Sequence, residues 1–117
     1  MDSKIIGFHE YKGTWQPGVT ETLSTRTEPE NKKDRFAVAV MKGVAIVGHL
    51  PVCKSGRFAK TVHFFLRASV ENECSAIVTG KAVNLGDRKG VTVPCSLKFT
   101  GPRKFISLIR NALPKTV

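Results

Sequence analysis

The chain has 117 residues and carries 19 Lys and Arg against 9 Asp and Glu, so its formal net charge is +10. That length fits a single domain over 1–117 with one core, and a hydrophobic content of 41% is enough to form it. No apolar run approaches the roughly 20 residues that cross a bilayer, and the first residues lack a signal peptide's apolar stretch. The cation excess favours a polyanionic partner over a membrane, because Lys and Arg bind phosphates and release counterions.

Four apolar or β-branched runs predict strands in the first half of the chain: Lys4–Phe8, Val19–Arg26, Phe36–Met41 and Val44–Leu50. Lys42-Gly43 lies between the last two runs and predicts a tight hairpin turn. Pro51 ends the second hairpin strand, because proline lacks a ladder donor. The segments Glu10–Gly18 and Thr27–Arg35 are polar or contain Gly and Pro, which indicates loops.

The second half predicts two helices and two more strands. Apolar residues spaced i, i+4, i+7 and i+8 predict a helix over Ser55–Arg67. They are Phe58, Val62, Phe65 and Leu66. Strands follow at Cys74–Val83 and Val91–Phe99, and a second helix at Pro102–Ala112. The apolar stripe of this second helix is formed by Phe105, Leu108, Ile109 and Ala112. This order predicts a mainly β fold with two helices, a six-stranded OB-like β-barrel.

The residues that enzymes and metal sites need are largely missing. His9, His49 and His63 have no metal-ligand spacing, and the three cysteines match no CxxC pattern. We therefore expect a binding module, not an enzyme, with no cofactor and no metal. His63 is interpreted as a structural residue of the first helix. An odd number of cysteines, with two of them in core-like strands, fits a reducing compartment inside the cell.

Two segments carry a family resemblance. Glu28–Val40 has the pattern acidic-Pro-x-Asn-x-x-Asp-x-x-Ala-hydrophobic, and Ile46–Pro51 adds hydrophobic-Gly-His-hydrophobic about ten residues later. Together they resemble the signature of the HIRAN domain. Weaker matches in the right order are Gly7–Tyr11, Val91–Pro94 and Phe99–Gly101. The resemblance covers about residues 4 to 112, nearly the whole chain.

The resemblance implies an OB-like fold and a DNA-binding function. In fork-remodelling helicases the HIRAN domain captures the 3′-hydroxyl end of single-stranded DNA, which implies a nuclear role in DNA repair or replication-fork processing. The candidate DNA-binding residues are His9, Glu10, Tyr11, Asn31, Lys33, Asp34, Arg35, His49, Lys54 and Val91. Chemically, Asp34 can accept a hydrogen bond from a 3′-hydroxyl. His49 and the cations can donate to phosphates, and Tyr11 offers a ring for stacking.

A competing interpretation gives these residues structural roles. Asn31 and Asp34 then close a turn with side-chain-to-backbone bonds, and Tyr11 covers the core. The chain also departs from the helicase version, because Glu10, Lys33 and Val91 stand where that version presents aromatic rings. Each ring contributes about 1–3 kcal/mol of stacking. The alternative functions are a protein-interaction module, or a basic barrel that binds RNA or other polyanions without end specificity.

Overall fold

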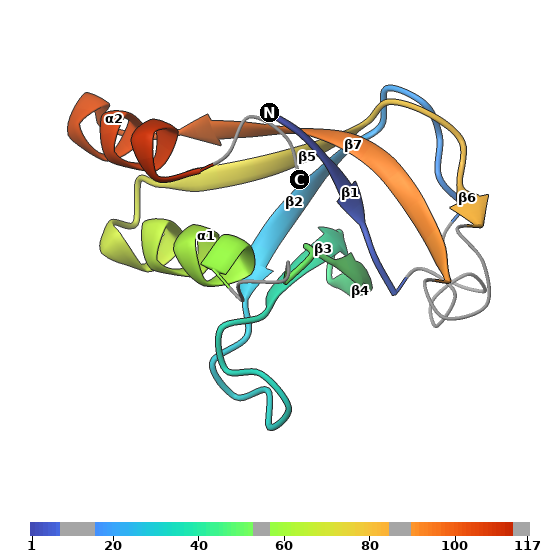
Figure 1. Cartoon of the computed structure of the whole chain (residues 1–117), viewed down its shortest axis with the longest axis horizontal. Helices are drawn as coiled ribbons and strands as arrows, with labels where there is room; N and C mark the ends of the chain where they lie inside the picture. The colour runs from blue at the N-terminus through green and yellow to red at the C-terminus, as the bar shows by residue number, and fades with distance from the viewer. Residues whose placement is uncertain (8–15, 53–56, 85–89, 114–117) are drawn as a thin grey trace.

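The structure, a computed structural model, describes residues 1–7, 16–52, 57–84 and 90–113. Its elements in chain order are β1 (Asp2–Ile5), β2 (Thr22–Thr27), β3 (Val38–Lys42), β4 (Ala45–His49), α1 (Arg57–Ala68), β5 (Glu73–Val78), β6 (Val83–Asn84), β7 (Val91–Thr100) and α2 (Arg103–Ala112). Within this described part, six strands form a curled antiparallel sheet in the order β1-β7-β5-β2-β3-β4, and the short β6 pairs with β7 (Figure 1). The predicted mainly β, OB-like barrel with two helices is confirmed.

The two edge strands of this sheet meet where the barrel closes. The N–H of Ile6 donates to the carbonyl of His49, and the N–H of His49 donates to the carbonyl of Ile6, both at 2.9 Å. Gly48 permits this approach, because a Cβ there would lie 2.4 Å from Cγ2 of Ile5 and 2.8 Å from the carbonyl oxygen of Ile6. The Gly-His pair of the sequence motif therefore closes the barrel.

The hairpin turn lies one residue later than predicted. Lys42 pairs with Ala45, so the two turn residues are Gly43 and Val44. Gly43 has φ +61, a conformation that only glycine adopts freely, and it therefore takes the first turn position. The first two strands also end elsewhere than expected: β1 covers Asp2–Ile5, and β2 covers Thr22–Thr27.

The predicted strand Cys74–Val83 is divided into β5 and β6, which corrects that prediction. Pairing between β5 and β7 ends at Val78 and Cys95, and the next residue of β7 is Pro94. Proline has no N–H to donate, so the ladder cannot continue there. The carbonyl of Pro94 still accepts from Thr79, and the chain passes close over the proline ring at Gly80.

The core fills the space between the sheet and α1. It consists of Ile5, Leu23, Val38, Val40, Val47, Leu50, Phe58, Val62, Cys74, Ala76, Val78, Val93, Cys95 and Leu97. The predicted apolar face of the first helix is confirmed, since Phe58, Val62 and Phe65 are buried. Phe65 meets Phe99 of β7 edge to face, with ring centroids 5.5 Å apart.

The second helix is less buried than its apolar stripe predicted. Ile109 is the one residue of α2 that is buried among the described residues, and Leu108 is 66% exposed. The reason is that α2 packs beside α1 at the edge of the molecule (Figure 1), where a shallow apolar groove stays open between the two helices. Neither α1 nor α2 is long and apolar enough to cross a membrane.

Candidate nucleic-acid interface

The loop between β2 and β3, residues 28–37, is built by its own backbone bonds. The N–H of Glu28 donates to the carbonyl of Ala37 at 3.1 Å and closes the base of the loop. Inside it, Asn31 donates to Glu28 at 3.0 Å, and Ala37 donates to Asp34 at 3.1 Å. These bonds fix the backbone of a loop that projects beside α1 (Figure 1).

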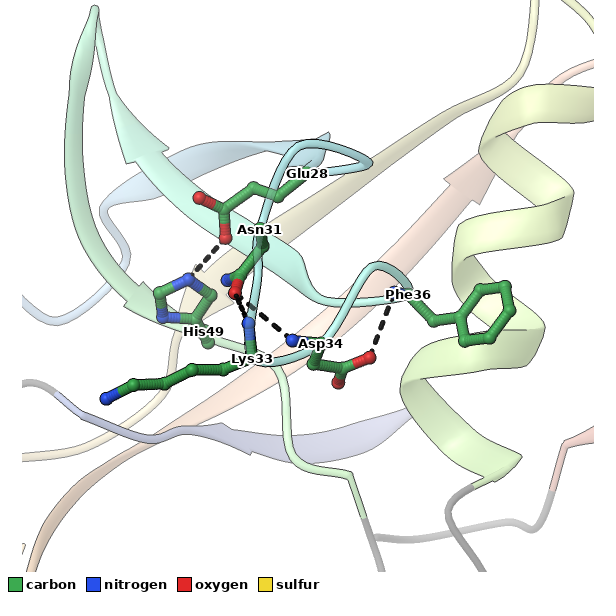
Figure 2. Close-up of polar contacts among 6 residues, drawn as sticks. All are labelled: Glu28, Asn31, Lys33, Asp34, Phe36 and His49. Atoms are coloured by element: carbon green, nitrogen blue, oxygen red, sulfur yellow. Dashed lines mark hydrogen bonds and ion pairs between the residues drawn. The ribbon is translucent and has the colours of Figure 1, made fainter.

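Two side chains of the sequence motif, Asn31 and Asp34, add hydrogen bonds to the backbone of the loop (Figure 2). Oδ1 of Asn31 accepts from the backbone N–H of Lys33 at 2.9 Å and of Asp34 at 3.2 Å. Oδ1 of Asp34 accepts from the N–H of Phe36 at 2.9 Å. Both residues therefore close turns, as the competing interpretation had it. No described residue hydrogen-bonds Oδ2 of Asp34, so one carboxylate oxygen stays available as an acceptor, and the ligand role of both residues stays a prediction.

A contact between Glu28 and His49 joins the start of the loop to the point where the barrel closes. Nε2 of His49 lies 2.5 Å from Oε1 of Glu28, which is only 8% exposed (Figure 2). A buried carboxylate is costly without a partner, and His49 supplies one. Sequence reasoning assigned His49 to phosphate contact and gave Glu28 no role, although Glu28 is the acidic residue of the motif.

The structure brings part of the predicted site together. Figure 2 shows the Lys33 side chain on the same flank of the loop as His49, and Phe36 pointing the other way, toward α1. Arg35 belongs to the α1 side, because its guanidinium lies over the Phe36 ring at 5.0 Å from the centroid. Val91 lies at the first position of β7, opposite Asn84, and not on the loop. The predictions for His9, Glu10, Tyr11 and Lys54 fall outside the described residues.

A pocket lies where the loop meets α1, with a volume of about 380 Å³. We call it the aromatic pocket; its lining residues are Pro29, Arg35, Phe36, His63, Phe64 and Arg67. The rings of Phe36 and Phe64 have centroids 5.5 Å apart, and Nζ of Lys60 lies 4.7 Å from the Phe36 centroid. Except for Arg35, sequence reasoning proposed none of these residues as ligand contacts. The sequence does contain one indication that Phe64 is exposed. It lies off the apolar helix face that Phe58, Val62 and Phe65 define.

His63 is buried beside this pocket, which agrees with its predicted structural role. Its ring meets those of Phe36 and Phe64 edge to face. Burial lowers the pKa of His63 below its usual 6.5, and Arg67 lowers it further, while Asp34 opposes the shift. Its Nδ1 is buried and has no hydrogen-bond partner among the described residues. Burial and the neighbouring Arg67 of α1 therefore favour the neutral form of His63, and Asp34 of the loop opposes them.

Neither a metal-binding cluster nor a reactive thiol occurs in the part of the chain that the structure describes. Within the described ranges, no group of three or more His, Cys, Asp and Glu side chains could hold a metal ion. Cys74 and Cys95 are buried free thiols, and burial raises the pKa of each to about 12. A thiol with that pKa stays protonated and unreactive at neutral pH.

Comparison with known proteins gives a structural similarity. No protein-family model matches the sequence, and no curated protein matches it. The structure is similar to the crystal structure of the HIRAN domain of human HLTF, with a TM-score of 0.70 and 18% sequence identity. The similarity covers 95% of this chain and 83% of that one. The chain therefore has a HIRAN-like fold, as the resemblance in its motifs predicted.

Proposed function

We propose that this chain is a non-enzymatic nucleic-acid-binding module that binds single-stranded DNA and recognises a free 3′ end. The HIRAN-like fold and the net charge of +10 support binding of DNA. End recognition rests on one observation. Asp34 is fixed by its bond from the Phe36 N–H, keeps Oδ2 available, and sits between the exposed cations Lys33 and Arg35.

The chemistry of a DNA end suits this arrangement. A free 3′-hydroxyl is a donor and a carboxylate oxygen is an acceptor, while the neighbouring cations attract the phosphates of the strand. A 3′-phosphate places negative charge against Asp34 instead and is repelled. The same residues thus attract a strand and discriminate between its two kinds of end. In a cell this activity belongs to nuclear DNA repair or replication-fork processing, as in the helicases that carry HIRAN domains.

The test compares short single-stranded DNA with a free and with a phosphorylated 3′ end by fluorescence anisotropy. Asp34→Asn keeps an oxygen for the Phe36 N–H but removes the charged acceptor. A hydrogen bond to a charged group contributes about 1.5–3 kcal/mol, so free-ended DNA should bind about 10- to 150-fold more weakly. Binding of 3′-phosphorylated DNA should not weaken.

The matched control is Glu30→Gln, which removes a second, exposed carboxylate from the same loop. It should improve binding of both DNAs equally, because it changes only the charge. If Asp34→Asn behaves like Glu30→Gln, end recognition is wrong and only a basic surface remains. A stronger affinity for structured RNA would favour the RNA-binding alternative. No binding of DNA at low salt would favour a protein-interaction module.

A further inference from the structure

We infer that the aromatic pocket is a second subsite for the same DNA strand, which binds a nucleotide upstream of the 3′ end by stacking and phosphate contact. The inference rests on the proposed function and extends it from Asp34 to the α1 side of the loop. It assigns ligand contact to Phe64 and Arg67 of α1 and to Arg35 and Phe36 of the loop.

The first argument is the composition of the pocket wall. Two phenyl rings, Phe36 and Phe64, stand beside the guanidinium groups of Arg35 and Arg67. Phe64 is 52% exposed, so its ring is open to a ligand. An exposed phenyl ring next to guanidinium groups fits a nucleotide, since every base has a face to stack and a phosphate beside it. A cavity of about 380 Å³ is of the size that small ligands occupy.

The second argument is charge. Arg35, Arg67 and Lys60 gather around the two rings. The negative charge that offsets these cations comes from Asp34, which raises the pKa of His63. Oδ1 of Asp34 already accepts a hydrogen bond from the N–H of Phe36. Across α1, the sequence contains no acidic residue. The positive charge therefore surrounds the exposed Phe64 ring. A flat, anionic ligand can stack on that ring and contact the cations at the same time.

The third argument is position. The aromatic pocket and the motif side of the loop share one backbone: Lys33 points to the His49 flank, and Phe36 points to α1 (Figure 2). Asp34 lies between them in the chain. A strand whose 3′-hydroxyl reaches Asp34 can thus continue over the loop toward α1. The two phenyl rings that a base can stack on, Phe36 and Phe64, lie on the α1 flank.

The test measures the affinity of single-stranded DNA of about a dozen nucleotides for variants of the pocket. Phe64→Leu keeps an apolar side chain but removes the ring, and it should weaken binding about 5- to 150-fold, the loss of one stacked base. Phe64→Trp should retain binding. Arg67→Ala should weaken binding and reduce the slope of log affinity against log salt by about 0.7, the value for one phosphate of a single strand.

Two controls separate this subsite from its surroundings. Leu108→Ala removes an exposed apolar side chain from the groove between α1 and α2, which Phe64 also lines, and should not change binding. Arg110→Ala removes an exposed cation of α2 and should leave the salt slope unchanged. If Phe64→Leu binds like the parent chain, or if Leu108→Ala loses as much, the subsite is wrong. If the parent chain itself binds no single-stranded DNA, the proposed function fails as well.

Discussion

Gly48 offers the sharpest test of how the barrel closes. A Cβ at this position would lie 2.4 Å from Cγ2 of Ile5 and 2.8 Å from the carbonyl oxygen of Ile6. Ile5 is fully buried and cannot swing away into solvent. In Gly48→Ala the molecule either keeps the contact and overpacks it, or separates the strands and gives up the two bonds between Ile6 and His49. Overpacking costs about 1–3 kcal/mol, and two hydrogen bonds together contribute about 1–3 kcal/mol.

The expected loss in unfolding free energy is therefore about 1–3 kcal/mol, whichever route is cheaper. Chemical denaturation followed by fluorescence or circular dichroism measures it. Gly18→Ala is the matched control, because among the described residues a Cβ at Gly18 would meet only Oε1 of Glu21, at an ordinary 3.7 Å. That variant should stay within about 0.5 kcal/mol of the parent. Equal unfolding free energies for Gly48→Ala and Gly18→Ala would refute the reasoning about closure.

Three further predictions concern the core and its titratable groups. Phe65→Ala should cost roughly 3–5 kcal/mol of unfolding free energy, because it empties a buried site that packs on Phe99; an unchanged melting temperature would contradict it. Cys74 and Cys95, each with a pKa of about 12, should resist alkylation at pH 8 until denaturant is added, as peptide mass mapping can show. The lowered pKa of His63 means that the unfolded chain binds its proton at higher pH than the folded chain, so unfolding free energy should fall as pH drops below 6.5. Denaturant titrations at pH 7 and pH 5 should show a smaller fall in His63→Gln, and an equal fall would contradict the assignment.

The sequence alone predicted the elements that have strong periodicity. Helix α1 was predicted because its buried residues recur at helical spacing, and β7 because its buried residues recur at period two. The hairpin turn was misplaced by one residue, because Lys42-Gly43 and Gly43-Val44 are equally compatible with the flanking strands, and only the register decides. The break between β5 and β6 was missed because its cause, Pro94, lies on a neighbouring strand.

The candidate site was harder still to predict from the sequence, because it depends on contacts between distant segments. The motif pointed to Asn31 and Asp34, but periodicity carries no information on whether their oxygens bind the loop or a ligand. The pairing of His49 with Glu28, and of Phe36 with α1, joins residues that are distant in sequence. Such contacts follow from the barrel's closure and from the packing of α1, so they become visible only when the fold is known.

A final prediction separates one strand that crosses the loop from two strands bound on its two flanks. If one strand contacts Asp34 and Phe64 together, each substitution weakens the same complex. The free-energy losses of Asp34→Asn and Phe64→Leu should then add in the double variant, as they do for sites without shared partners. If the flanks bind separate strands, each single variant keeps the other site, and the double variant loses far more than the sum. Anisotropy titrations of the four proteins with the same free-ended DNA measure this difference. A loss well beyond the sum would show that the aromatic pocket does not continue the path of the strand held at Asp34.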